Sequence, residues 1–173
     1  MQIRALRESD DRSRFRSGDP DLDRFLQRFA GQNQFRLYIG VTYVAVEEVD
    51  ILGFATVAPS HIEIEGMPVA ERTKLPRYPL PVLRLARLAV DRSVRGQGLG
   101  GRLLRFVLDL ALRMAGDYGC VGVVVDAKAD AVEFYASYGF APVEALLGAS
   151  EARPQPKPMF LALRAIKAAR KGR

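Results

Sequence analysis

Residues 88–100 read LAVDRSVRGQGLG, and this stretch decides the interpretation of the chain around it. Its apolar start is typical of a strand, glycines then stand at alternate positions, and a sequence with helical periodicity begins directly after them. Glycine lets backbone N–H groups approach an anion closely, and a helix start offers unpaired N–H donors with a partial positive charge. The stretch therefore predicts a cradle for a pyrophosphate, with Arg95 as a direct cation.

The sequence on both sides of this stretch predicts alternating strands and helices. Residues 17–20 are typical of a capped helix start, and residues 66–81 hold four prolines, which predicts an extended loop without a helix. We expect strands at 37–46, 51–57, 60–65, 82–90, 121–125 and 159–163. We expect one helix after residue 20, one after residue 101 and one at 127–138. The pattern favours an α/β fold with a mixed, mostly antiparallel central sheet flanked by helices on both faces.

Length and composition favour one soluble domain. A chain of 173 residues fits a single domain at 1–163 with a basic tail at 164–173, and 49% apolar with 27% charged residues is typical of a folded protein. The longest uncharged run is shorter than a membrane-spanning helix, and no apolar leader opens the chain. Because Cys120 and His61 are each alone in their class, an internal disulfide and a Cys/His zinc cluster are excluded. We expect a cytoplasmic protein without a metal or a membrane partner.

The net charge of +6 is spread unevenly along the chain. Residues 37–71 hold six acids and no Lys or Arg, whereas residues 72–105 hold nine basic residues and Asp91 alone. The last ten residues add five basic residues and no acid. Clustered Lys and Arg attract phosphates, so this asymmetry indicates a polyanionic partner. A solvated basic face with a soluble tail is the alternative.

Two kinds of nucleotide site use a glycine loop of this form. Gly96, Gly98 and Gly101 also satisfy the spacing of a dinucleotide-binding loop, and Asp126 ends a later predicted strand where a ribose-binding acid could lie. The loop, however, follows several antiparallel strands, and too few residues remain after it to complete a doubly wound sheet. These positions favour a different cofactor. A tight turn that holds no ligand is the third interpretation.

Residues 95–100, RGQGLG, resemble the acyl-coenzyme A loop of the GNAT acetyltransferases, whose pattern is Gln/Arg-x-x-Gly-x-Gly/Ala. Residues 133–140, EFYASYGF, are similar to the Phe-Tyr-x-x-x-Gly-Phe helix end of that family. The resemblance implies a single GNAT-fold domain that binds acetyl-CoA. It implies that the strand end pairs with the pantetheine arm and that loop amides hold the pyrophosphate, which assigns to the cofactor Leu88, Ala89, Val90, Arg95, Gly96, Gln97, Gly98, Leu99 and Gly100.

Tyr135 lies where members of this family often carry a tyrosine that protonates the departing thiolate. A phenol with the ordinary pKa of about 10 keeps its proton at pH 7 and can hydrogen-bond a developing negative charge. The alternative role for Tyr135 is packing against Phe134, Tyr138 and Phe140. Tyr138, three residues further along the same predicted helix, is the natural control.

A general base is harder to identify. His61, Glu63 and Glu65 lie on an alternating predicted strand end, where such side chains are usually solvated. A lysine side chain, with a pKa of about 10.4, needs help to lose its proton, whereas an α-amine, with a pKa of about 7.7–8.0, is already partly neutral. An α-amino group is therefore the favoured acceptor.

Residues 15–26, FRSGDPDLDRFL, are similar to the opening of one GNAT branch, the toxins of type II toxin–antitoxin pairs. Residues 75–81 and 85–91 also resemble that branch. The resemblance implies an enzyme that acetylates the α-amino group of aminoacyl-tRNA and blocks translation. It implies neutralisation by an antitoxin with a ribbon-helix-helix domain, and a homodimer.

The basic block at 72–105 agrees with a tRNA substrate, because tRNA is a polyanion. Our candidate contacts to the tRNA backbone are Arg72, Lys74, Arg77, Arg84 and Arg87. Phosphate contacts position a nucleic acid without reading it, so the acetylated amino acid stays open. Two other functions also stay open: a housekeeping GNAT acting on a small amine or a protein N-terminus, and a non-enzymatic module that binds acyl-CoA or nucleic acid.

Overall fold

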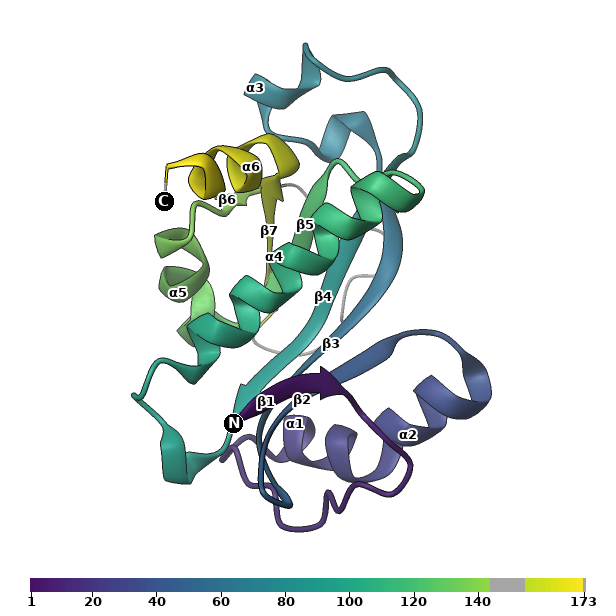
Figure 1. Ribbon diagram of the computed structural model, residues 1–173. Coiled ribbons are helices and arrows are strands. Elements are labelled where there is room, and N and C mark those ends of the chain that lie inside the picture. The colour runs from purple at the N-terminus through teal and green to yellow at the C-terminus, as the bar shows by residue number, and fades with distance from the viewer. Residues whose placement is uncertain (144–154, 173) are drawn as a thin grey trace. The chain divides into compact units, whose positions relative to one another are not determined.

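The computed structural model describes residues 1–143 and 155–172. The strands in these residues form one sheet in the order β1-β2-β3-β4-β5-β7-β6 (Figure 1). Their bounds are Gln2–Ala5 (β1), Val41–Glu47 (β2), Asp50–Ile62 (β3), Leu80–Val90 (β4), Gly122–Ala127 (β5), Ala141–Pro142 (β6) and Lys157–Ala162 (β7). The pairs β1–β2, β2–β3, β5–β7 and β6–β7 are antiparallel. The predicted α/β fold with a mostly antiparallel mixed sheet is confirmed.

The helices are short except for one. The α-helices are Pro20–Arg24 (α1), Ala30–Gln32 (α2), Val69–Arg72 (α3), Leu99–Asp117 (α4), Val132–Ser137 (α5) and Leu163–Lys171 (α6). Two π-helical turns, Phe25–Phe29 (η1) and Asn33–Leu37 (η2), continue α1 and α2, and 3-10 turns form at Ile64–Gly66, Arg92–Val94 and Ala129–Ala131. Within the described residues, no helix combines the length and the apolar character that crossing a membrane requires.

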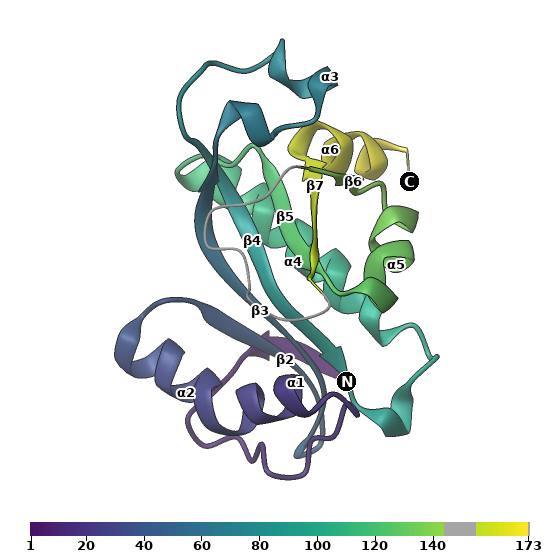
Figure 2. The ribbon, with the colours of Figure 1, turned by 180° about the vertical axis from the view of Figure 1, so that it is seen from behind.

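The chain forms two compact units, each built from two segments. Unit 1 comprises Met1–Ala58 and Leu85–Val107, and unit 2 comprises Pro59–Arg84 and Leu108–Arg173. In unit 1, successive strand residues face opposite ways, as a pleated sheet requires. Val44 packs in a core with Phe25 and Leu26 of η1, while Ala45 packs with Leu99 and Leu103 of α4. Helices therefore cover both faces of the sheet in unit 1 (Figure 2).

Unit 2 has its own core, where strand and loop side chains meet. Val82, Val124 and Phe160 from three strands pack with Ile64 and Met67 from the segment after β3. All five side chains are at least nine-tenths buried. This packing gives the proline-containing segment at 66–81 an apolar anchor although it carries little regular structure.

Several expectations about elements differ from the structure. The strand expected at 37–46 begins only at Val41, because the turn η2 extends to Leu37 and the chain leaves it through Tyr38 in the left-handed region, with φ 55°. The strand expected at 60–65 is not separate: residues 60–62 end β3, and Ile64–Gly66 form a 3-10 turn. The prediction that 66–81 holds no helix is wrong: α3 forms there after Pro68, at a position where a missing N–H costs no helical hydrogen bond. The expected tail at 164–173 begins within α6, where Ile166 is buried.

Candidate active site

The glycine stretch begins in unit 1 as a 3-10 turn held by Asp91. One oxygen of the Asp91 carboxylate accepts hydrogen bonds from the N–H of Ser93 at 2.9 Å and from its hydroxyl at 2.7 Å. Gly96 and Gly98 then adopt φ +78° and +80°, a region that L side chains disfavour, and α4 begins at Leu99. The predicted order of strand, glycine loop and helix is confirmed.

The loop presents free backbone donors on an open side. In the parts of the chain that are described, none of the N–H groups of residues 96–100 donates a backbone hydrogen bond. A Cβ added at Gly96 or Gly98 would meet no protein atom within 4 Å, and residues 95–98 are exposed. Free N–H groups next to a helix N-terminus suit the oxygens of a pyrophosphate. The geometry of these residues therefore fits the diphosphate of a coenzyme.

Arg16 and Ser17, which are distant from this loop in the sequence, form hydrogen bonds with it. The N–H of Arg16 donates to the Asp91 carboxylate at 2.8 Å, and the N–H of Arg92 donates to the Arg16 carbonyl at 2.8 Å. The Arg95 guanidinium, expected as a direct cation for the ligand, donates to the Ser17 carbonyl. Burial opposes ionisation of Asp91, but the hydrogen bonds from Arg16 and Ser93 hold its pKa below the ordinary value.

Ser17 is fixed in turn by Asp23 of α1. Ser17 is 5% exposed, and its N–H and hydroxyl both donate to one Asp23 oxygen, at 2.8 and 2.6 Å. Gly18, with φ +94°, follows it and packs beside Arg95 and Arg92. In the sequence, residues 15–26 show only a similarity to one branch of a family, and that similarity predicts no role for Ser17 or Asp23. Its role is structural support for the loop, and the residue types alone do not reveal a contact across more than 70 positions.

The strand end before the loop, expected to pair with the pantetheine arm, lies at the end of β4. Ala89 is buried in the core with η1, whereas Leu88 and Val90 are half-buried on the side that packs with α4. The N–H of Asp91 donates to the Leu52 carbonyl at 2.8 Å and marks the last pairing with β3. Just upstream, the Arg87 guanidinium lies 3.8 Å from the centre of the Phe25 ring, a cation–π contact that buries its charge against unit 1.

Tyr135 lies in unit 2, on α5. It is 5% exposed, and its ring makes edge contacts with Phe134 at 5.1 Å and Phe140 at 5.5 Å. Tyr138 contacts Phe134 and is half-buried. The aromatic packing that we expected as the alternative role of Tyr135 is therefore present.

The Tyr135 hydroxyl is also chemically distinctive. Burial raises the pKa of Tyr135 well above the ordinary value for a phenol. Among residues 1–143 and 155–172, no hydrogen bond engages its hydroxyl. A buried phenol that keeps its proton and has no protein partner can donate that proton to a ligand, so packing and proton donation are compatible roles.

The five candidate tRNA contacts fall into two groups. Three of them already bind within the protein: Arg84 forms an ion pair with Asp126 at 2.5 Å, Arg72 donates to two backbone carbonyls, and Arg87 stacks on an aromatic ring. Lys74 and Arg77, in contrast, are exposed, and neither side chain forms an ion pair or hydrogen bond in the described residues. These two are the cations best suited to meet an external phosphate.

Two further sequence-based candidates can be located. Asp126, considered as a ribose-binding acid, is bound to Arg84 and is not available for a ribose hydroxyl on that side. His61, Glu63 and Glu65, considered as general bases, are all exposed. An exposed imidazole or carboxylate has no enclosed environment that would tune it for proton abstraction.

The chain matches known proteins over most of its length. A family described as "Acetyltransferase (GNAT) domain" matches residues 39–142. A relative named "tRNA-acetylating toxin" from Mycobacterium tuberculosis (strain ATCC 25618 / H37Rv) is 33% identical over 140 residues, which are 79% of this chain and 82% of the relative.

Two solved structures extend this similarity to the whole chain. The structure of AtaT complexed with acetyl-methionyl-tRNAfMet superposes with a TM-score of 0.83 at 27% identity, covering 97% of this chain and 98% of AtaT. A tyrosine-to-phenylalanine mutant of the AtaT toxin, bound to the C-terminus of the antitoxin AtaR and to acetyl-CoA, superposes with a TM-score of 0.74 at 26% identity, covering 97% of this chain and 96% of that one.

Proposed function

Since this chain belongs to the GNAT acetyltransferase family, we propose that it is a toxin that transfers an acetyl group from acetyl-CoA to the α-amino group of an aminoacyl-tRNA. The observation that carries the proposal is the glycine loop, exposed at 95–98 and with unpaired amides at 96–100, in a chain that is 33% identical to a tRNA-acetylating toxin. Acetylation of this amine removes the nucleophile of peptide-bond formation, so translation stops.

The loop and the strand end would bind the cofactor. When bound, acetyl-CoA supplies an acetyl group activated as a thioester. The N–H groups of residues 96–100 would hold its diphosphate, and Leu88, Ala89 and Val90 would pair with the pantetheine arm. Asp91, Arg16 and Ser17 keep the loop in this shape before the cofactor arrives, which lowers the cost of ordering it on binding.

Tyr135 would supply the proton that the transfer consumes. Its raised pKa keeps the hydroxyl protonated across the physiological range, so it acts as an acid and not as a base. The proton would pass from the Tyr135 hydroxyl to the departing sulfur, and the proton lost by the amine would return the tyrosine to its starting state. The exposed His61, Glu63 and Glu65 support an acceptor that needs no strong base, as an α-amine does.

Lys74 and Arg77 would contact the tRNA backbone directly. Arg72, Arg84 and Arg87 would keep their partners within the protein and add to the positive potential that attracts the tRNA. We infer that a cognate antitoxin with a ribbon-helix-helix domain neutralises the toxin, and that the enzyme is a homodimer acting in the cytoplasm, where charged tRNA is found. The solved AtaT complexes with tRNA and with an antitoxin segment support these partner classes.

The test is an acetyl-transfer assay. The protein is incubated with labelled acetyl-CoA and bulk charged tRNA, and the aminoacyl species that gain the label are identified. The proposal predicts label on the amino acid of at least one charged tRNA and none on uncharged tRNA. Tyr135→Phe should lower kcat by about a hundredfold or more, the contribution of a positioned acid, while Tyr138→Phe should retain most activity.

Two results would contradict the proposal. Labelling of a small amine or a protein N-terminus, with no label on charged tRNA, would assign the chain to the housekeeping GNAT function. Full activity of Tyr135→Phe would remove the tyrosine from the reaction and leave it with a packing role only. Growth arrest on expression, relieved by Tyr135→Phe, is the matching result in cells.

A further inference from the structure

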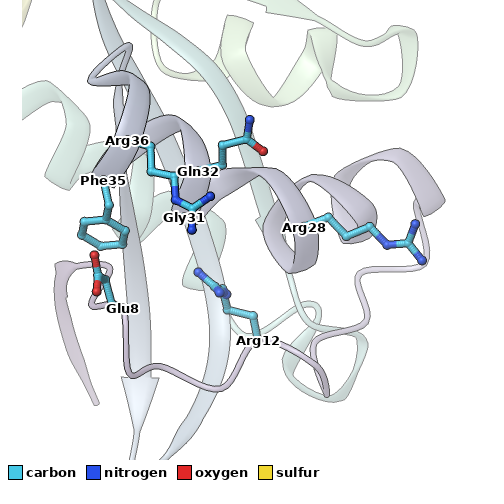
Figure 3. A pocket seen from close by; sticks show the side chains of 7 residues that line it. All are labelled: Glu8, Arg12, Arg28, Gly31, Gln32, Phe35 and Arg36. Atoms are coloured by element: carbon cyan, nitrogen blue, oxygen red, sulfur yellow. The ribbon is translucent and has the colours of Figure 1, made fainter.

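A second site candidate lies in unit 1, away from the glycine loop in the sequence. A pocket of about 350 Å³ opens between the segment after β1 and the helical turns α2 and η2 (Figure 3). Three arginines line it, Arg12, Arg28 and Arg36, against one acid, Glu8. None of the residues assigned above to cofactor, proton transfer or tRNA lines this pocket.

Arg12 is the unusual member of the pocket. Its Nη1 is buried and has no hydrogen-bond partner within the described residues. Gly31 makes room for it, because a Cβ at that position would approach this nitrogen to 2.5 Å. A buried donor without a partner destabilises the folded state, and so does glycine inside a helix relative to alanine. Both costs are explained if the guanidinium is kept for an external acceptor.

A second guanidinium, that of Arg36, is directed toward the guanidinium of Arg12 (Figure 3). Figure 3 shows the guanidinium groups of Arg12 and Arg36 pointing toward one another, with the Glu8 carboxylate beside the Phe35 ring and Arg28 directed away. Neither the Arg36 nor the Arg28 side chain forms an ion pair or hydrogen bond with the described residues. Arg36 belongs to the π-helical turn η2, a type of turn found often at functional sites. Two guanidinium groups that face one another attract an anion, and Glu8 supplies the one carboxylate of the lining against three arginines.

The surface next to Arg36 is apolar. Leu37, Tyr38 and Ile39 directly follow it in the chain and are 51%, 82% and 58% exposed. Tyr38 is the C-cap of η2, and its left-handed conformation, with φ 55°, ends the turn. Exposed apolar patches beside charged groups are typical of protein contact sites. A nucleic-acid backbone offers phosphates but no apolar side chains to such a patch.

We propose that this pocket binds a carboxylate side chain of an acidic, apolar segment of a partner protein. The carboxylate accepts hydrogen bonds from Arg12 and Arg36 together, which satisfies the unpaired Arg12 nitrogen. Apolar side chains of the same segment cover residues 37–39. The proposal does not depend on acetyl transfer to tRNA.

The test uses a phage-displayed library of short random peptides, selected on the full-length protein. Selected peptides should carry Asp or Glu next to Leu, Ile or Phe. The affinity of the best synthetic peptide should fall about tenfold for Arg12→Gln or Arg36→Gln, the loss expected for one charge-assisted pair. Replacing the acid of the peptide by its amide should cause the same loss.

Arg24→Gln is the matched control, because Arg24 lies on α1 in the same unit, is exposed and pairs with Asp21 outside the pocket. This variant should bind the peptide normally. If Arg12→Gln fails to fold, as judged by circular dichroism, the exposed Arg36 still provides the test. Acetyl transfer by Arg36→Gln should be unchanged, so a failure of the proposed activity and a failure of the pocket are separate results.

Three outcomes would overturn the proposal. They are selected peptides without acidic residues, peptides whose affinity is the same for the arginine variants and the wild type, and a selection that enriches nothing. A short oligouridylate serves as a parallel probe. If its binding falls in the Arg12 and Arg36 variants while no peptide is enriched, the pocket belongs to a nucleic-acid phosphate.

Discussion

At the scale of single residues, burial decides what each ionisable group can do. Tyr135 and Asp10 are opposite cases. The Tyr135 hydroxyl is buried without a hydrogen-bond partner among the described residues and keeps its proton, whereas Asp10 is held by the two terminal guanidinium nitrogens of Arg4 at 2.8 Å and stays ionised. Each shift in pKa has a consequence for stability whose sign can be stated and measured.

Tyr135 should make the protein sensitive to alkali. Because its pKa is raised in the folded state, its contribution to stability is complete below the unfolded value of about 10 and is lost as pH rises above it. The free energy of unfolding of the wild type should therefore fall more steeply above pH 10 than that of Tyr135→Phe. Denaturant titrations at neutral and alkaline pH measure this difference. Parallel curves would show that the phenol is already solvated.

Asp10 should have the opposite effect, in acid. The hydrogen bonds from Arg4 lower the pKa of Asp10, so its contribution is present above about pH 4, the unfolded value, and is lost as pH falls below it. Asp10→Asn should destabilise the protein at pH 7 by about 1–2 kcal/mol, since it leaves Arg4 without its partner. The gap from the wild type should close at low pH in denaturant titrations, and a gap independent of pH would contradict the assignment.

At the scale of elements, the glycine loop depends on the segment at 15–23. Three hydrogen bonds join this segment to the loop: Arg16 with Asp91, Arg92 with Arg16, and Arg95 with Ser17. Asp23 in turn accepts a hydrogen bond from Ser17. Asp23→Ala should loosen the loop and raise KM for acetyl-CoA about fivefold, the equivalent of one hydrogen bond, with little change in kcat. Asp21→Ala, two residues earlier on the same helix, is the control, because the Asp21 side chain pairs with the exposed Arg24. Equal KM values for both variants would show that the support is not needed.

The sequence predicts some of these elements and misses others for physical reasons. The loop at 95–100 could be predicted because glycine spacing, strand end and helix start are local and consecutive. The support from Arg16 and the ion pair of Arg84 with Asp126 could not, since each joins residues that are tens of positions apart. The expected strand at 37–46 is present as β2 but begins only at Val41, because η2 extends to Leu37 and ends at Tyr38 in a left-handed conformation. The residue type at position 38 does not predict that conformation.

At the scale of the whole molecule, the uneven charge is the basis for expecting a polyanionic substrate. Three of the five predicted cations bind inside the protein, so we propose that Lys74 and Arg77 make the external contact. The KM for charged tRNA should rise steeply with salt, because each neutralised phosphate releases counterions. The double variant Lys74→Gln and Arg77→Gln should raise this KM and flatten the salt dependence, with KM for acetyl-CoA unchanged. Turnover that is indifferent to salt would favour a small substrate.

Binding of a CoA thioester by the loop at 95–100 is the central claim about this protein. A crystal structure of the protein with acetyl-CoA tests this directly. We expect the diphosphate oxygens to accept hydrogen bonds from the N–H groups of residues 96–100 and the thioester sulfur to lie within reach of the Tyr135 hydroxyl. A cofactor bound elsewhere, or a loop whose amides stay free in the presence of saturating acetyl-CoA, would contradict the account.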